Sequence, residues 1–179
     1  MHARLACTLA ALLTVSACAT EGVSVPGIPV APAPAPTGSA AFRLSDFAWS
    51  TAPGQGRIDG QLAYRVRDTV HSCEKAGVLL TPETPWVRSR MSILYGTGEK
   101  VVLPAAEVRR RTPPERPDYA RFVKRTSCDS AGRFQFGGLP DGTWYVITVA
   151  QPLPADAGVD VAIMRRVTIR GGKAVKVVL

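Results

Sequence analysis

Histidine is nearly absent from this chain of 179 residues, which contains only His2 and His71. Asp68, His71 and Ser72 lie close together in the sequence. However, a nucleophile, its base and the acid that orients the base are brought together by folding rather than by adjacency. The chain also lacks a Walker loop and an HExxH motif. We therefore predict no catalytic residue, no metal site and no cofactor, and we keep an unrecognised hydrolase that uses His71 as an alternative.

No apolar run near the N-terminus is long enough to cross a bilayer. Residues 5–17 are uncharged and apolar, but as a helix they would rise only about 20 Å, against about 30 Å of hydrocarbon. Together with the basic residue Arg4, this length is typical of a signal peptide over residues 1–17. The run ends in Val-Ser-Ala-Cys at residues 15–18, which resembles the bacterial lipobox. The resemblance implies cleavage before Cys18 and lipid on its thiol.

The lipid would make the membrane the first partner of this protein, because two or more acyl chains hold a protein firmly to a bilayer. Residue 19 is Ala rather than Asp. By resemblance to Gram-negative lipoproteins, this favours the outer membrane, with the domain facing the periplasm or the cell surface. The alternative is an ordinary secretory signal, cut near Ala17 or Ala19, that leaves Cys18 as a free thiol.

The segment after the cysteine, residues 18–44, is rich in proline and poor in charge. Its Ala-Pro repeat at residues 31–36 cannot form a helix or a central strand, because proline lacks the amide donor and fixes φ. Polyproline II favours an extended tether of about 3.1 Å per residue. We therefore predict a disordered linker over residues 18–44 and a folded domain over residues 45–179.

Acidic residues are outnumbered, and the formal net charge is +8. Residues 88–125 carry ten Lys or Arg and four Asp or Glu. A basic surface attracts anionic partners. We predict contact with an anionic envelope glycan or lipid, or with an envelope protein, and no contact with nucleic acid. The candidate contact residues are Arg109, Arg110, Arg111, Arg121, Lys124 and Arg125. A second basic group near the C-terminus would extend this face if the two converge. Solvated strands and loops are the alternative.

Short apolar segments separated by turn residues make up the rest of the chain. Residues 57–66 alternate with period two, and residues 143–149 contain only strong β-formers. Further strands are predicted at residues 77–80, 121–126, 134–136, 161–169 and 174–179. Gly171 and Gly172 can form the two-residue turn of a hairpin between the last two segments. About seven strands predict an all-β, antiparallel Greek-key sandwich.

One helix is predicted to interrupt the strands at residues 85–95. Thr84 can cap its N-terminus, Pro85 suits the first helical position and Gly96 can end it. A weaker helical pattern covers residues 105–111.

The segment at residues 128–146, Cys-Asp-Ser-Ala-Gly-Arg-Phe-Gln-Phe-Gly-Gly-Leu-Pro-Asp-Gly-Thr-Trp-Tyr-Val, contains two turns and alternating aromatic residues. It resembles the signature of carboxypeptidase regulatory-like domains, and residues 76–82 resemble an earlier strand of that family. The resemblance covers about residues 57–151 and implies a transthyretin-like sandwich. It implies little about function, because a fold of this kind is used for many purposes. We therefore expect a non-enzymatic interaction or structural module.

Four cysteines are present, at positions 7, 18, 73 and 128. Cys7 would be lost with the signal peptide and Cys18 would carry lipid. Cys73 and Cys128 remain as an even pair in an exported domain, so we predict a disulfide between them. Two buried free thiols are the alternative. Of the tryptophans, Trp144 is predicted to lie in the core, whereas Trp86 is the candidate for a sugar platform.

Overall fold

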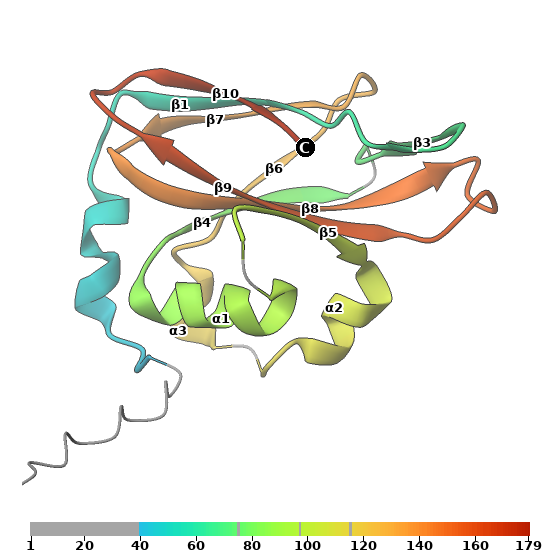
Figure 1. Cartoon of the computed structure of the whole chain (residues 1–179). Helices are drawn as coiled ribbons and strands as arrows, with labels where there is room; N and C mark the ends of the chain where they lie inside the picture. The colour runs from blue at the N-terminus through green and yellow to red at the C-terminus, as the bar shows by residue number, and fades with distance from the viewer. Residues whose placement is uncertain (1–39, 75, 97, 115) are drawn as a thin grey trace, which may run out of the picture. The chain divides into compact units, whose positions relative to one another are not determined.

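The computed structural model describes residues 40–74, 76–96, 98–114 and 116–179. It confirms the predicted fold class, because two β-sheets pack face to face and short helices lie beneath the larger sheet (Figure 1). The predicted signal peptide, Cys18 and residues 19–39 of the linker lie outside the described residues. Ala40 and Phe42 already contact the domain: the Ala40 amide donates to Ser89 Oγ at 3.2 Å, and the Phe42 ring lies 5.1 Å from that of Trp86.

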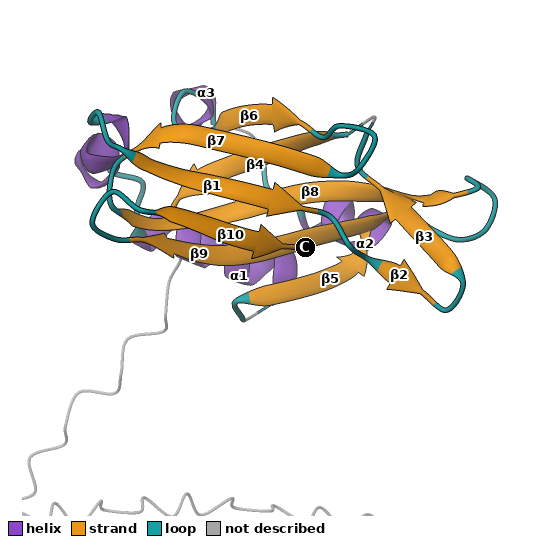
Figure 2. Ribbon diagram, turned by 90° about the horizontal axis from the view of Figure 1, so that it is seen from above, coloured by secondary structure: helices purple, strands orange, loops and turns teal. Residues whose placement is uncertain are grey.

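The smaller sheet has three strands in the order β10-β1-β7 (Figure 2). They are β1 (Gly56–Gln61), β7 (Arg133–Leu139) and β10 (Ala174–Val178). β7 runs antiparallel to β1, whereas β10 runs parallel to it, with Ile58 opposite Val175. The sheet therefore departs from the purely antiparallel pairing that the sequence predicts.

The larger sheet is organised around one long strand, β8 (Gly142–Leu153). β8 pairs with β9 (Val161–Ile169) along one edge, and with β3 (Thr69–Ser72) and β4 (Gly77–Pro82) at different points along its length. The sheet is completed by β2 (Arg65–Val66), β5 (Lys100–Pro104) and β6 (Lys124–Ser127). β3 and β5 fall in segments without clear alternation, and β2 is a separate piece at the end of the strand predicted at residues 57–66, which explains why the sequence predicts fewer strands.

The helices flank the strands and supply a third layer. The predicted helix is confirmed as α1 (Pro85–Tyr95): Thr84 Oγ1 accepts from the Val87 amide at 3.1 Å. The weaker pattern forms α2 (Ala105–Arg111), and two further short helices are η1 (Leu44–Thr51) and α3 (Pro117–Ala120). Among the described residues, no helix has the length and apolar character needed to span a membrane.

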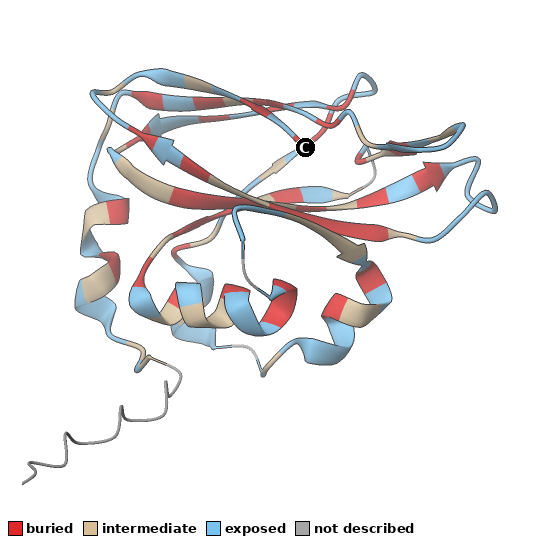
Figure 3. Cartoon of the chain, viewed as in Figure 1, coloured by how far each residue is buried: buried red, intermediate tan, exposed pale blue. Residues whose placement is uncertain are grey.

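Two hydrophobic cores result from the three layers. Trp144 and Val146 of β8 point into the core between the sheets, whereas Tyr145 contributes to the core between the larger sheet and the helices. Figure 3 shows the buried residues of β8 and β9 sandwiched between these layers. Because both faces of these strands are covered, their sequences are almost continuously apolar rather than alternating.

The last two strands do not form the predicted hairpin. Gly171 and Gly172 adopt φ values of +62° and +65°, as a primed turn requires, and the Lys173 amide donates to the Arg170 carbonyl at 3.4 Å. However, β9 pairs with β5 and β8, whereas β10 pairs with β1. The turn therefore carries the chain from one sheet to the other, and the prediction of a hairpin is wrong because turn geometry does not specify the pairing partner.

Two predicted strands are shorter than expected. The first ends at Gln61 and the chain pairs again only from Arg65, so that Val66 is exposed instead of sharing the buried face of Ile58. The strand predicted at residues 121–126 begins at Lys124, because Phe122 lies in the turn after α3 and packs into the helix-side core. Tertiary packing overrides the local alternation at both places.

The predicted disulfide between Cys73 and Cys128 is present, with Cα atoms 5.7 Å apart. Cys73 follows β3 and Cys128 follows β6, and both side chains are buried in the core between the sheets. The bridge closes a loop of 55 residues. In the chain-entropy account, this stabilises the fold by about 4 kcal/mol.

Candidate functional site: an arginine-rimmed cavity

Folding brings together two of the six predicted basic residues, Arg109 of α2 and Arg125 of β6. Both line one cavity, and two arginines outside the predicted set, Arg90 of α1 and Arg116 just before α3, line it as well. We call this site the arginine-rimmed cavity. Its lining includes no acidic side chain among the described residues. In the sequence, Arg90 and Arg116 belong to the excess of basic residues at 88–125. That excess does not indicate which of these residues line the same cavity.

The cavity lies between the helices and the outer face of the larger sheet, and its volume is about 280 Å³. Apolar side chains make up most of its interior. The sheet contributes Leu79, Ile147, Val149 and Ala162; the helices and their connections contribute Met91, Leu94, Ala105, Val108, Ala120 and Val123. The site therefore combines an apolar interior with a cationic rim.

Aromatic rings hold two of the rim arginines. The guanidinium carbon of Arg90 lies 5.6 Å from the centroid of the Trp86 ring and 5.9 Å from that of Tyr119. The guanidinium carbon of Arg116 lies 4.6 Å from the centroid of the Phe42 ring. Cation–π contacts of this kind orient a guanidinium without adding a negative charge beside it. Of the ion pairs among the described residues, Arg116 has one, at 3.9 Å from Asp118, and none involves Arg109 or Arg125.

Two tyrosines add neutral polar groups to the lining. Burial raises the pKa of Tyr95 to about 12. Burial also raises the pKa of Tyr119, although the hydrogen bond with Thr81 and the nearby Arg90 act to lower it. Both hydroxyl groups therefore remain protonated at neutral pH, and neither adds negative charge to the cavity.

The other four predicted contact residues lie away from this rim. Arg111 donates to Glu107 on its own helix, and Arg121 stacks on Phe122 with its guanidinium carbon 4.9 Å from the ring centroid. Arg110 and Lys124 are exposed on α2 and β6, and neither lines the cavity. The predicted basic face is therefore only partly assembled into one site.

The basic residues near the C-terminus do not extend the arginine rim. β10 lies in the smaller sheet, in the layer opposite the helices (Figure 1). Arg166 of β9 is committed to Glu83 and Glu99. Burial acts to raise the pKa of Glu83, but hydrogen bonds from Arg166 and Arg88 outweigh it and hold that pKa below its ordinary value. This cluster is a structural ion-pair network rather than a free cationic surface.

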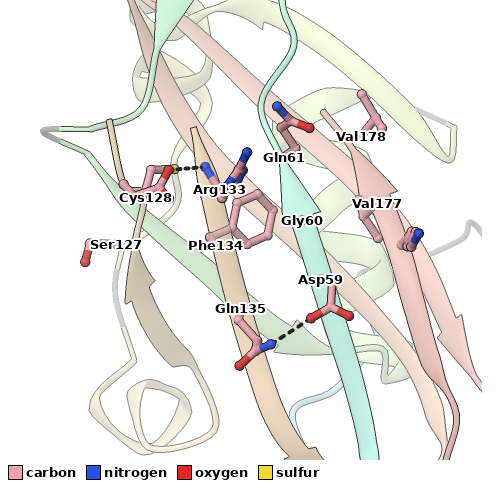
Figure 4. A pocket seen from close by; sticks show the side chains of 12 residues that line it. Asp59, Gly60, Gln61, Ser127, Cys128, Arg133, Phe134, Gln135, Val177 and Val178 are labelled. Carbon is pink, nitrogen blue, oxygen red and sulfur yellow. Dashed lines mark hydrogen bonds between the residues drawn. The ribbon is translucent and has the colours of Figure 1, made fainter. Parts of the chain in front are cut away.

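A second concavity lies on the outer face of the smaller sheet, and we call it the polar groove (Figure 4). Neighbouring strands place Asp59 opposite both Gln135 and Lys176, so that these side chains share one face. Gln135 Nε2 donates to Asp59 Oδ1 at 2.8 Å. The groove presents carboxylate, amide and ammonium groups side by side, which suits a ligand rich in hydroxyl groups.

His71 is buried, with 6% of its surface exposed. Its ring packs edge-on against Tyr64 at 5.1 Å between centroids. His71 and Ser72 are adjacent on β3 and point to opposite faces of the strand. Ser72 Oγ accepts from the Glu74 amide at 3.1 Å. The described residues also contain no cluster of three or more potential metal ligands.

The structure tests one of the two predictions made for the tryptophans. Trp144 is fully buried between the sheets, as expected. Trp86 is half-buried and packs against Phe42 and Tyr119, with centroids 5.1 and 4.9 Å away. Trp86 supports Arg90 and also lines a concavity with Arg90 and Arg116, so its role as a sugar platform stays a prediction.

No protein family matches this sequence, and no curated protein does either. A solved structure does resemble the fold: the crystal structure of a protein from Pseudomonas aeruginosa described as a putative carbohydrate binding protein. The TM-score is 0.60 at 22% sequence identity, and the match covers 78% of this chain and 97% of that one. At this identity, the likeness establishes the shared fold.

Proposed function

We propose that this protein is a membrane-anchored, non-catalytic binding module of the bacterial cell envelope. Its ligand is an anionic envelope component that binds at the arginine-rimmed cavity. The observation that carries the proposal is the convergence of Arg90, Arg109, Arg116 and Arg125 on one cavity whose described lining contains no acid. Guanidinium groups recognise carboxylate and phosphate through paired hydrogen bonds, and they remain charged at every physiological pH.

The envelope setting is supported by the N-terminal sequence and by the disulfide. Cys18 ends a lipobox-like motif, and the proline-rich residues after it suit a tether. The Cys73–Cys128 bridge is of the kind that persists in oxidising compartments such as the periplasm. We further propose that the sandwich is of the transthyretin-like type. The signature-like segment at residues 128–146 supports this assignment.

The test of the ligand class is binding of lipopolysaccharide by the full-length protein at low and high salt. We expect salt-sensitive binding, because exposed charges are screened by ions. The paired substitution Arg109→Gln/Arg125→Gln should abolish it. Its matched control is Arg110→Gln/Lys124→Gln, which changes neighbouring residues on the same two elements by the same total charge and leaves the cavity lining intact. Equal binding by the two variants would discard the proposal.

The test of the anchor is fractionation of cells that express the protein. Cys18→Ser removes the only thiol that the lipobox-like motif offers for lipid. We expect the wild-type protein in the membrane fraction and the variant outside it. A membrane-bound variant would show that residues other than Cys18 anchor the chain.

Carbohydrate binding at the polar groove is a second candidate function. Its basis is the row of Asp59, Gln135 and Lys176 on one sheet face, and the description of the structural neighbour as a putative carbohydrate binding protein supports it. A screen of neutral oligosaccharides should then find a ligand whose binding is lost in Gln135→Ala and kept in Arg109→Gln/Arg125→Gln. The opposite pattern would assign all binding to the cavity.

A further inference from the structure

The apolar interior of the arginine-rimmed cavity indicates a property of the ligand that the charge of the rim does not. Leu79, Ile147 and Val149 come from neighbouring strands of the larger sheet and line the cavity together. Val108 of α2 and Met91 of α1 line it from the helix side and are buried. A purely ionic ligand would leave these apolar side chains without a partner. The interior therefore indicates that the ligand also has an apolar part.

The rim is charged and exposed, whereas the interior is apolar and buried, and an amphiphilic ligand needs both. Arg109 and Arg125 have exposed side chains, whereas Ala105 and Ala162 are almost fully buried. Burial of apolar ligand surface in such an interior is favourable. Charged groups of a ligand would at the same time remain near the rim, where Arg90 and Arg116 are already oriented by aromatic rings.

The size of the cavity limits the ligand further. Its volume of about 280 Å³ is just below the usual range of ligand pockets, which is about 300–1,000 Å³. This suits one hydrocarbon chain and excludes the body of a lipid with several chains.

We propose that the arginine-rimmed cavity binds a fatty acid, with its hydrocarbon chain in the apolar interior and its carboxylate at the rim arginines. This inference rests on the proposed function and names the ligand of the same site. It commits to a single-chain carboxylate because one chain fits the volume and because guanidinium groups pair with carboxylate in a bidentate manner. No covalent step is involved.

The experiment measures binding to the purified full-length protein by equilibrium dialysis, with three probes. Dodecanoate has both the chain and the charge, 1-dodecanol has the chain alone, and butyrate has the charge with little chain. We expect one dodecanoate bound per protein, and affinities for the other two probes that are at least about tenfold weaker, since each lacks one half of the recognition. Equal affinity for dodecanoate and dodecanol would overturn the role of the rim.

Substitutions then locate the bound molecule. Arg109→Gln/Arg125→Gln should weaken dodecanoate binding by about tenfold or more, which is the scale of one charge-assisted hydrogen bond. Arg110→Gln/Lys124→Gln should leave it unchanged. Val149→Phe replaces a half-buried side chain of the interior with a larger aromatic one and should also weaken dodecanoate binding. Unchanged binding in the first variant would overturn the proposal.

A fluorescence measurement keeps the proposal testable even if Val149→Phe folds poorly. Trp86 is adjacent to the rim through Arg90 and Tyr119, whereas Trp49 and Trp144 pack on each other at the core between the sheets. A fatty acid brominated along its chain should quench the wild-type emission, and Trp86→Phe should remove that quenching. Quenching that persists in Trp86→Phe would place the chain elsewhere.

The failure of this inference differs from the failure of the proposed function. Lipopolysaccharide binding that depends on Arg109 and Arg125, without any dodecanoate binding, would overturn the fatty acid and keep the anionic binding module. Loss of both would overturn both. An interior already filled by another part of the chain would give no dodecanoate binding to the full-length protein, which also counts against the inference.

Discussion

Thr81 Oγ1 and Tyr119 Oη lie 2.7 Å apart and form a hydrogen bond between β4 and α3. Thr81 is 1% exposed, and α3 has only four residues, so this bond ties a short, largely exposed helix to the sheet. Tyr119 also lines the arginine-rimmed cavity and packs on Trp86. The position of the cavity wall therefore depends on a contact between residues that are 38 positions apart.

The first prediction concerns this bond. Tyr119→Phe should lower the free energy of unfolding by about 1 kcal/mol, because it leaves the buried Thr81 hydroxyl without its partner. Urea denaturation of the single variants and of Thr81→Val/Tyr119→Phe forms a double-mutant cycle. We expect the double variant to lose less than the sum of the single variants. Strict additivity would show that the two hydroxyl groups do not interact.

The second prediction concerns the disulfide. Cys73→Ala/Cys128→Ala should lower the stability by about 4 kcal/mol, because the bridge restricts the unfolded chain over a loop of 55 residues. Denaturation of the wild-type protein with and without reductant provides the same comparison without substitution. Alkylation of both thiols in the folded, unreduced protein would contradict the bridge.

The third prediction concerns pH. The pKa of Glu83 lies below its ordinary value of 4.5, because hydrogen bonds from Arg166 and Arg88 outweigh the effect of burial. The folded state therefore binds this proton less tightly than the unfolded state does. The carboxylate contributes stability above about pH 4.5, and this contribution is lost as the pH falls through the folded pKa.

Glu83→Gln should accordingly be less stable than the wild type at neutral pH, by about 1–3 kcal/mol, and the difference should shrink as the pH falls below 4.5. Denaturation midpoints at several pH values measure this change. Glu107→Gln is the control, because its ion pair with Arg111 lies on the surface and such pairs contribute little. A pH-independent difference would show that the charge of Glu83 is not the cause.

The fourth prediction concerns Gly60 in β1. A Cβ atom at this position would lie 2.0 Å from the ring of Phe134, which is 5% exposed and packs across the glycine. Gly60→Ala should destabilise the protein by about 1–3 kcal/mol, because the buried ring must move. Gly77→Ala is the control in a strand, since the nearest atom to its added carbon lies 3.8 Å away. Equal midpoints of thermal unfolding for Gly60→Ala and the wild type would show that the Phe134 ring is free to shift.

The sequence-based predictions succeed where the cause is local. Thr84, Pro85 and Gly96 define the bounds of α1, because capping and backbone preferences act within a single turn. Asp129 accepts hydrogen bonds from the Ala131 and Arg133 amides at 3.0 and 2.7 Å, as the predicted turn requires. These contacts involve neighbours in the chain, so their residues are visible side by side in the sequence.

Predictions fail where partners are distant. Nothing near Gly171 and Gly172 reveals that β10 will join β1 instead of β9, because both pairings use the same turn. The sequence likewise does not distinguish the basic residues of 88–125 that line the cavity from those that do not. In the structure, Arg109 lines the cavity while Arg110, one position along the helix, does not, because adjacent residues of a helix point in different directions.

The sequence by itself determined the strand-rich composition, helix α1, the turns and the pairing of the two domain cysteines, since each follows from local preferences or from elimination. Cys18 remains a sequence prediction. Only the tertiary structure decided the distribution of strands between the sheets, the burial of His71 and the meeting of four arginines above an apolar interior. Those features depend on which surfaces pack together, and long-range packing is selected by the whole core and not by any one segment.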